Sequence, residues 1–254
     1  MFTVTTAQLD AWLAAFVYPF FRVLALASSA PLFSHPSVPR PVRIGLAILV
    51  TVLVAPTLPV TAPVSPLSAD GVLLIAQQLV IGVAVGLAMQ IVFGAVNIAG
   101  DLIGLQMGLS FAAFVDPQNA GEAPVVGSFL ALVLMLLFLA LDGHLLLIAA
   151  LVDTFHAFPL GATGFSSIDA RGLVTAGRDL FAVGLQLALP VIAALLLANL
   201  ALGVLTRTAP QLNLFAVGFP ITLLVGMLML LFALPFMLPA LEAAVLRGLA
   251  LVGR

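Results

Sequence analysis

Cysteine and lysine are absent from this sequence, and charged residues of any kind are scarce. Without cysteine the chain forms no disulfide and holds no thiolate-bound metal, iron–sulfur cluster or cysteine nucleophile. Its eight cations are all arginines, scattered along the chain, and the formal net charge is −2. No basic stripe is available for nucleic acid, so we do not expect the protein to bind it.

Hydrophobic residues dominate what is present. They make up 63% of the 254 residues, and only 7% are charged, whereas a soluble domain has about 25% charged residues. A soluble fold of this length needs a polar shell that the sequence cannot supply. We therefore expect lipid or other apolar chains to surround the protein. Because the N-terminus lacks a basic segment and carries Asp10, we also expect the first helix to be retained.

Apolar stretches long enough to cross a membrane recur along the chain. A spanning helix needs roughly 20 apolar residues, and the lack of water in hydrocarbon favours helix because every backbone polar group must be paired. We predict an all-α, polytopic membrane protein. Its six hydrophobic helices run approximately Leu9 to Phe33, Val42 to Leu58, Val72 to Leu105, Val125 to Val152, Leu180 to Leu205 and Leu214 to Leu246.

Prolines interrupt several of these predicted helices. In a membrane protein such breaks are tolerated where neighbouring helices satisfy the freed backbone groups, which favours packing in a bundle; ordinary kinked spans are the alternative. The interior prolines are Pro19, Pro190, Pro220, Pro235 and Pro239.

Arginine placement does not orient the chain. Six spans would leave three arginines on one side, Arg40, Arg43 and Arg207, and four on the other, Arg171, Arg178, Arg247 and Arg254. The positive-inside rule decides nothing from such a balance. Either the number of spans differs from six, or the helices do not simply cross the membrane one after another in alternating directions.

Glycines recur at a spacing of four residues in the third predicted helix. Gly100, Gly104 and Gly108 share one helical face, and Gly82 and Gly86 repeat the spacing upstream. Small residues at this spacing let helix backbones approach closely. We interpret Gly82, Gly86, Gly100 and Gly104 as helix-packing positions, either within the chain or at a specific assembly contact.

Four titratable residues accompany the fourth predicted helix: Asp142, His144, Asp153 and His156. Charge at membrane depth is costly and marks a pathway or a buried pair. These residues are therefore candidates for a proton relay, and helix ends or inter-helix hydrogen bonds are the alternative. Other polar residues within or beside apolar segments are Arg22, Asn97, Asp101 and Asn199.

Enzyme signatures are missing. The sequence has no Walker A loop, GxGxxG, HExxH or GxSxG motif. The segment most similar to GxSxG is GLSFA at 108–112, which lacks the final glycine of a nucleophile elbow. We therefore predict a protein without catalytic residues, cofactor or metal site.

The loop from Gln106 to Pro124 keeps Phe111 and Phe114 between Gly108 and the Asp116-Pro117 pair. Glycine and proline indicate a break in the helix, and apolar aromatic side chains in a loop must be buried against something. One hypothesis is a plug that closes a conduit; a re-entrant or interfacial loop is the alternative.

A second loop joins the last two helices. It contains Arg207, Pro210, Gln211, Asn213 and Phe215 and reads as a helical hairpin turn. Its polar side chains either cap the helices or face a shared pore.

These two loops, together with the segment at 142–161, resemble the FliR family of flagellar type III export-apparatus proteins. The resemblance covers nearly the whole chain. It rests on VPRPVR at 38–43, QMGLSFAAFVDP at 106–117, LALPVIAALLLANLALGVLTRTAPQLNLFAVGFP at 187–220, and Gly143-His144.

The resemblance implies a non-catalytic subunit of the flagellar export gate in the bacterial inner membrane, at the flagellar basal body. With FliP and FliQ it would form the channel for unfolded flagellar proteins, and FlhB and FlhA would be further partners. Residues 1–178 would be a FliP-like part and 179–254 a FliQ-like hairpin. Much of the chain would be raised out of the bilayer plane, which would explain the arginine balance.

The family's plug loop corresponds to Gln106 through Glu122, with Phe111 and Phe114 giving apolar closure and Gly108 backbone freedom. The hairpin would face the cytoplasmic entrance. Alternatives to the flagellar gate are the equivalent subunit of a virulence injectisome, a proton-coupled secondary transporter and a purely structural membrane scaffold. The residues assigned to the plug and gate are Gln106, Met107, Gly108, Leu109, Ser110, Phe111, Phe114, Asp116 and Pro117.

Overall fold

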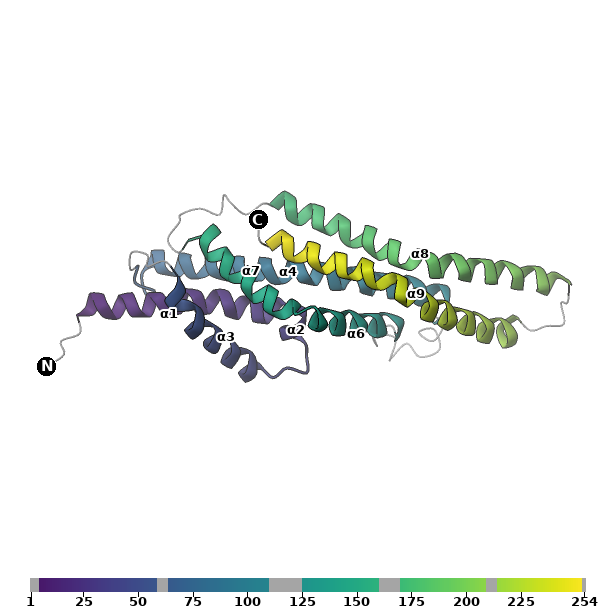
Figure 1. Cartoon of the computed structure of the whole chain (residues 1–254), viewed down its shortest axis with the longest axis horizontal. Coiled ribbons are helices and arrows are strands. Elements are labelled where there is room, and N and C mark those ends of the chain that lie inside the picture. The colour runs from purple at the N-terminus through teal and green to yellow at the C-terminus, as the bar shows by residue number, and fades with distance from the viewer. Residues whose placement is uncertain (1–4, 59–63, 110–124, 160–169, 209–213, 253–254) are drawn as a thin grey trace. The chain divides into compact units, whose positions relative to one another are not determined.

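The computed structural model describes residues 5–58, 64–109, 125–159, 170–208 and 214–252, and in these ranges the chain is helical and contains no strand (Figure 1). The predicted all-α class is confirmed. The helices are α1 (Thr6–Ser29), α2 (Pro31–Ser34), α3 (Arg40–Val54), the 3-10 turn η1 (Ala55–Thr57), α4 (Ala69–Gln106), α6 (Val125–Ala140), α7 (Gly143–Ala157), α8 (Ala170–Thr208) and α9 (Leu214–Val252).

Helices able to cross a membrane confirm the polytopic prediction. Across the ranges that the structure describes, five are long and apolar enough to span: α1, α3 with η1, α4, α8 and α9. The pair α6 and α7 reaches this length only when counted together, which gives up to six spans. Helix α4 has 38 residues, and α8 and α9 have 39 each. At 1.5 Å per residue each is about 57 Å long, roughly twice the thickness of the hydrocarbon layer.

The helix predicted from Val125 to Val152 is in fact broken at Leu141 and Asp142. Asp142 has a left-handed backbone with φ of 53°, a conformation that aspartate adopts more readily than most residues. Its carbonyl accepts hydrogen bonds from the amides of Leu145 and Leu146 as α7 begins. Hydropathy does not reveal this break, because the residues on both sides are apolar.

Other helix boundaries are shifted from the approximate predicted ones, and the largest shift is at the start of α8. The first helix ends at Ser29 and not at Phe33. Pro31 has no backbone N–H to continue the hydrogen bonds of the helix, and it instead starts α2. Helix α8 begins at Ala170 and not at Leu180, so part of the stretch read as a linker is helical. Its first ten residues include Arg171, Arg178 and Asp179, and these charged residues interrupt the apolar run from which the helix was predicted.

The chain forms two compact units. The first comprises residues 1–91, 142–175 and 246–254, and the second comprises residues 92–141 and 176–245. In the first unit α1 packs against α2 and α3. A capping box starts α1: the Thr5 hydroxyl accepts from the amide of Gln8, and the Gln8 side chain accepts from the amide of Thr5.

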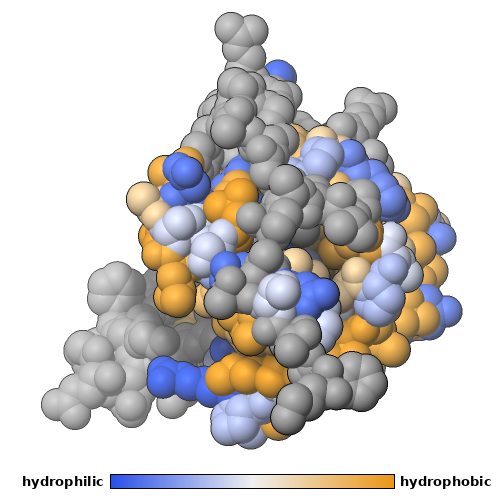
Figure 2. All heavy atoms as spheres, turned by 90° about the vertical axis from the view of Figure 1, so that its left-hand side faces the viewer, coloured by the Kyte–Doolittle hydropathy of each residue, from blue (hydrophilic) through white to orange (hydrophobic). Residues whose placement is uncertain are grey.

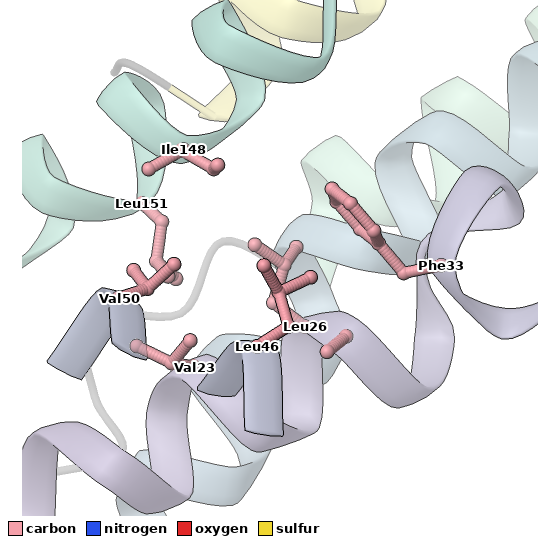
Figure 3. Close-up of a pocket in the computed structure, with 8 residues that line it drawn as sticks. Val23, Leu26, Phe33, Leu46, Val50, Ile148 and Leu151 are labelled. Carbon is pink, nitrogen blue, oxygen red and sulfur yellow. The ribbon is translucent and has the colours of Figure 1, made fainter. Parts of the chain in front are cut away.

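A small apolar gap lies inside the first unit, where side chains of α1, α2, α3 and α7 converge (Figure 3). All of the lining side chains are hydrocarbon, so none of them could orient a polar ligand. The lining residues are Val23, Leu26, Ala27, Phe33, Leu46, Val50, Ile148 and Leu151.

Large apolar side chains also remain at the surface. On α3 the exposed residues include Ile48, Leu49 and Leu53, and orange hydrophobic residues are prominent on the face drawn in Figure 2. A soluble monomer rarely exposes continuous apolar surface of this kind. The observed surface therefore agrees with the expectation that lipid or other helices surround the chain.

Candidate functional site

The predicted plug loop begins where α4 ends, and a glycine cap closes this helix end. Gly108 has a φ of 82°. Its amide donates to the carbonyl of Leu105, and the amide of Leu109 donates to the carbonyl of Gly104, both at 3.0 Å. This is the Schellman arrangement, in which a glycine in the left-handed region satisfies the last carbonyls of a helix. The chain therefore leaves α4 along a path fixed at Gly108.

Met107, the residue before this glycine, is 1% exposed and lies against α9 within the second unit. Its side chain occupies the space where a β-carbon of Gly226 would be, and the Thr222 hydroxyl donates to its carbonyl at 3.4 Å. The sequence reading included Met107 in the loop but missed Gly226 and Thr222. Gln106 is the last residue of α4 and is partly buried.

Other predicted loop residues lie outside the described ranges. Of the hairpin, Arg207 is exposed in the last turn of α8, and Phe215 lies in the first turn of α9. The predicted residues outside the described ranges are Ser110, Phe111, Phe114, Asp116 and Pro117 of the plug, and Pro210, Gln211 and Asn213 of the hairpin.

The predicted packing glycines differ in what they face. Side chains at Gly82 and Gly86 would collide with α1, at Arg22 and Ser29 respectively, and one at Gly100 would collide with the backbone of Gly127 on α6. Gly104 faces only Leu109, at an ordinary contact distance of 3.9 Å. Three of the four thus lie at close approaches between helices.

Arg22 is the most unusual polar residue that the structure describes, because it is fully buried in the middle of α1. Its Nε donates to Oε1 of Gln78 at 2.7 Å, its Nη1 to Oγ1 of Thr154 at 3.0 Å, and its Nη2 to the carbonyl of Phe158 at 3.0 Å. The guanidinium carbon also lies 3.9 Å from the centroid of the Phe155 ring, which is a cation–π contact.

Neutral groups alone stabilise this charge in the part of the chain that the structure describes. The carbonyl of Phe158 belongs to the C-cap of α7, where carbonyls lack helical partners and the helix dipole is negative. Arg22 therefore caps α7 and ties α1, α4 and α7 together within the first unit. Sequence reasoning marked Arg22 as polar in an apolar helix but found none of its partners.

The candidate proton-relay residues are spread along α7. Asp142, Asp153 and His156 are exposed, whereas His144 is partly buried, and its Nδ1 has no hydrogen-bond partner among the described residues. His144 and Asp153 are separated by about 13 Å along the helix at 1.5 Å per residue. Only apolar residues lie between them in sequence, so α7 by itself provides no continuous relay.

Comparison with known proteins addresses the resemblance directly. The family model described as bacterial export proteins, family 1, matches residues 13–248. The flagellar biosynthetic protein FliR of Pectobacterium carotovorum subsp. carotovorum is 48% identical over 95% of this chain and 92% of its own length. The protein of the same name from Escherichia coli (strain K12) is 47% identical over the same shares. The chain belongs to the FliR family.

FliR membership confirms the resemblance inferred from sequence, and it places the chain among bacterial flagellar biosynthesis and export proteins. A more distant FliR protein, from Bacillus subtilis (strain 168), is 34% identical over 85% of both chains. The likeness thus extends over most of the FliR sequence and includes both units described above.

Proposed function

We propose that this chain is a non-catalytic subunit of the flagellar type III export gate. Together with FliP and FliQ homologues it forms the channel that passes unfolded flagellar proteins across the bacterial inner membrane, next to FlhB and FlhA homologues. The observation that carries the proposal is the match of residues 13–248 to an export family. The relatives compared above are all named for the flagellum, which favours the flagellar system over an injectisome.

Two features of the fold support a role inside an assembly. Helices α4, α8 and α9 are about twice as long as a bilayer requires, so each must tilt strongly or extend beyond the hydrocarbon. Large apolar side chains on α8 and α9, such as Leu197, Leu200 and Leu231, are exposed. Neighbouring subunits would cover such surfaces where lipid does not.

The plug gives the proposal its mechanism. Helix α4 is anchored and capped directly before the segment that carries Phe111 and Phe114. In the closed state these apolar rings would seal the conduit against ions and water. An arriving substrate opens it by binding the open state more tightly, which requires a preference of about a few kcal/mol.

Deleting Phe111 to Asp116 from the encoded chain should make the cell membrane permeable to ions and small solutes, because the apolar closure is lost while the channel remains. Uptake of a small solute that the cell normally excludes measures this. A strain that also lacks the FliP homologue is the matched control, and it should stay sealed because no channel assembles. Unchanged permeability despite an intact complex would contradict the plug.

A further inference from the structure

Helix α3 is the spanning helix that the first unit leaves most open. Of the five helices able to cross a membrane in the described ranges, it has the smallest share of buried residues. Leu46 and Val50 line the small apolar gap inside the first unit, whereas Ile44, Ile48 and Leu49 are between 43% and 57% exposed. One side of α3 thus packs within the unit, and the other side is an apolar surface that the described residues leave open.

The length of α3 matches one bilayer. Its 15 residues rise about 22 Å at 1.5 Å per residue, and the three residues of η1 add about 6 Å at 2.0 Å per residue. The total of about 28 Å is close to the hydrocarbon thickness of about 30 Å, whereas α4, α8 and α9 are about twice as long as this layer is thick. With α3 across the hydrocarbon, its first turn lies at the level of the lipid headgroups.

Two arginines occupy that first turn. Arg40 is the first residue of α3 and is exposed, and Arg43 follows three residues later. Helical side chains lean toward the N-terminus of their helix, so both arginines extend away from the apolar stretch. The Nη2 of Arg43 donates to the carbonyls of Ser34 at 3.0 Å and His35 at 2.8 Å, while its Nε has no partner among the described residues. Arg43 is therefore held in place with part of its guanidinium unpaired.

No acidic side chain near in sequence balances these arginines. The chain contains no aspartate or glutamate between Asp10 and Asp70, and the first turn of α3 has none, although the helix dipole is positive there. Within the described ranges neither Arg40 nor Arg43 forms an ion pair with a carboxylate. Like charges three residues apart on a helix repel each other, so an anion bound beside them would be stabilising.

We propose that the start of α3 binds the headgroup of an anionic phospholipid, whose acyl chains lie along the exposed side of the helix. The phosphate oxygens accept hydrogen bonds from guanidinium groups, and the acyl chains cover Ile44, Ile48 and Leu49. Lipid suits this side better than a protein helix does, because large aliphatic residues dominate it, whereas contacts between membrane helices are rich in small residues. The site is independent of the proposed gate function, since it requires only that α3 lies in a bilayer.

Quenching of a tryptophan by brominated lipid tests the site. Trp12 is the only tryptophan of the chain, so Trp12→Phe with Ile44→Trp leaves one reporter, four residues after Arg40. The full chain, with any proteins that co-purify, is placed in bilayers of equal parts phosphatidylcholine and phosphatidylglycerol, with bromine on the acyl chains of one lipid or of the other. Trp12→Phe alone gives the background. We expect stronger quenching by brominated phosphatidylglycerol. Equal quenching by the two lipids, or none, would overturn the proposal.

Charge variants show whether Arg40 causes the preference. Arg40→Gln should reduce it by about fivefold, because an arginine near an anionic surface contributes about 1 kcal/mol, and Arg40→Lys should retain it. Arg207→Gln is the control, since Arg207 is exposed in the last turn of α8. A reporter at Leu53→Trp, near the other end of α3, should be quenched without the preference. The same preference at Leu53→Trp, or one that Arg40→Gln leaves unchanged, would also overturn the site.

Gly45→Leu distinguishes lipid from protein on this side of α3. Gly45 is exposed, and a β-carbon there meets nothing within 4 Å. Fluid acyl chains accommodate a leucine, so the folded chain and the proteins that co-purify with it should be recovered in unchanged amounts. Gly86→Leu is the contrasting variant, because its side chain would collide with Ser29, and it should lower the recovery of folded chain. Loss of co-purifying proteins from a folded Gly45→Leu chain would show that a protein covers α3, which would overturn the lipid site.

Discussion

Arg22→Ala is expected to destabilise the isolated chain more than any other single substitution considered for the first unit. The change removes the donors to Gln78, Thr154 and Phe158, and each buried acceptor left unpaired costs about 1–3 kcal/mol. Relief from burying a guanidinium offsets part of this. A net loss of about 3 kcal/mol in the free energy of unfolding remains, with the cavity adding to it.

Thermal unfolding of the purified chain in detergent measures the effect. Arg22→Ala should unfold at a clearly lower temperature than the parent, and Arg22→Lys should fall between them because one ammonium cannot reach all three acceptors. Arg40→Ala is the control, since Arg40 is exposed at the start of α3. Equal unfolding temperatures for Arg22→Ala and Arg40→Ala would show that the buried cluster contributes nothing.

Gly100→Ala and Gly203→Ala are expected to change stability in opposite directions. A β-carbon at Gly100 would overlap the backbone of Gly127 on α6, and overpacking of this kind costs about 1–3 kcal/mol. Gly203 lies in open space on α8, so alanine there should stabilise by up to about 1 kcal/mol through its higher helix propensity.

The comparison of unfolding temperatures uses the isolated chain, so that partner subunits do not contact either glycine. Gly100→Ala should lower the temperature and Gly203→Ala should leave it equal or raise it. An increase of the same size for both would mean that α4 and α6 are not in contact at Gly100.

Features of neighbouring residues in the sequence predicted the helices well. Apolar length placed every spanning helix, and glycine at 108 marked the end of α4, because both follow from the chemistry of adjacent residues. The span from Val125 to Val152 was predicted as one helix because apolar residues flank Asp142 on both sides, although a helix end was one interpretation of Asp142 and His144, and α7 does begin there. The early start of α8 was missed because Arg171, Arg178 and Asp179 interrupt the apolar run there, and charged residues are compatible with a helix that extends beyond hydrocarbon.

The partners across the fold could not be predicted. Arg22 bonds to residues 56, 132 and 136 positions away, and nothing in a single sequence pairs them. Glycines were recognised by regular spacing, which found Gly100 but neither Gly127 nor Gly226, because a lone glycine opposite a side chain has no periodic signal. Gly104 shows the reverse: it fits the spacing, yet its nearest neighbour is a residue of its own helix end.

We propose above all that this chain completes a channel with FliP and FliQ homologues. Affinity purification of the tagged chain from detergent-solubilised membranes, with the retained proteins identified by mass spectrometry, tests it most directly. We expect a stable complex that contains both homologues. Recovery of the folded chain without either of them, under conditions that preserve FliP with FliQ, would contradict it.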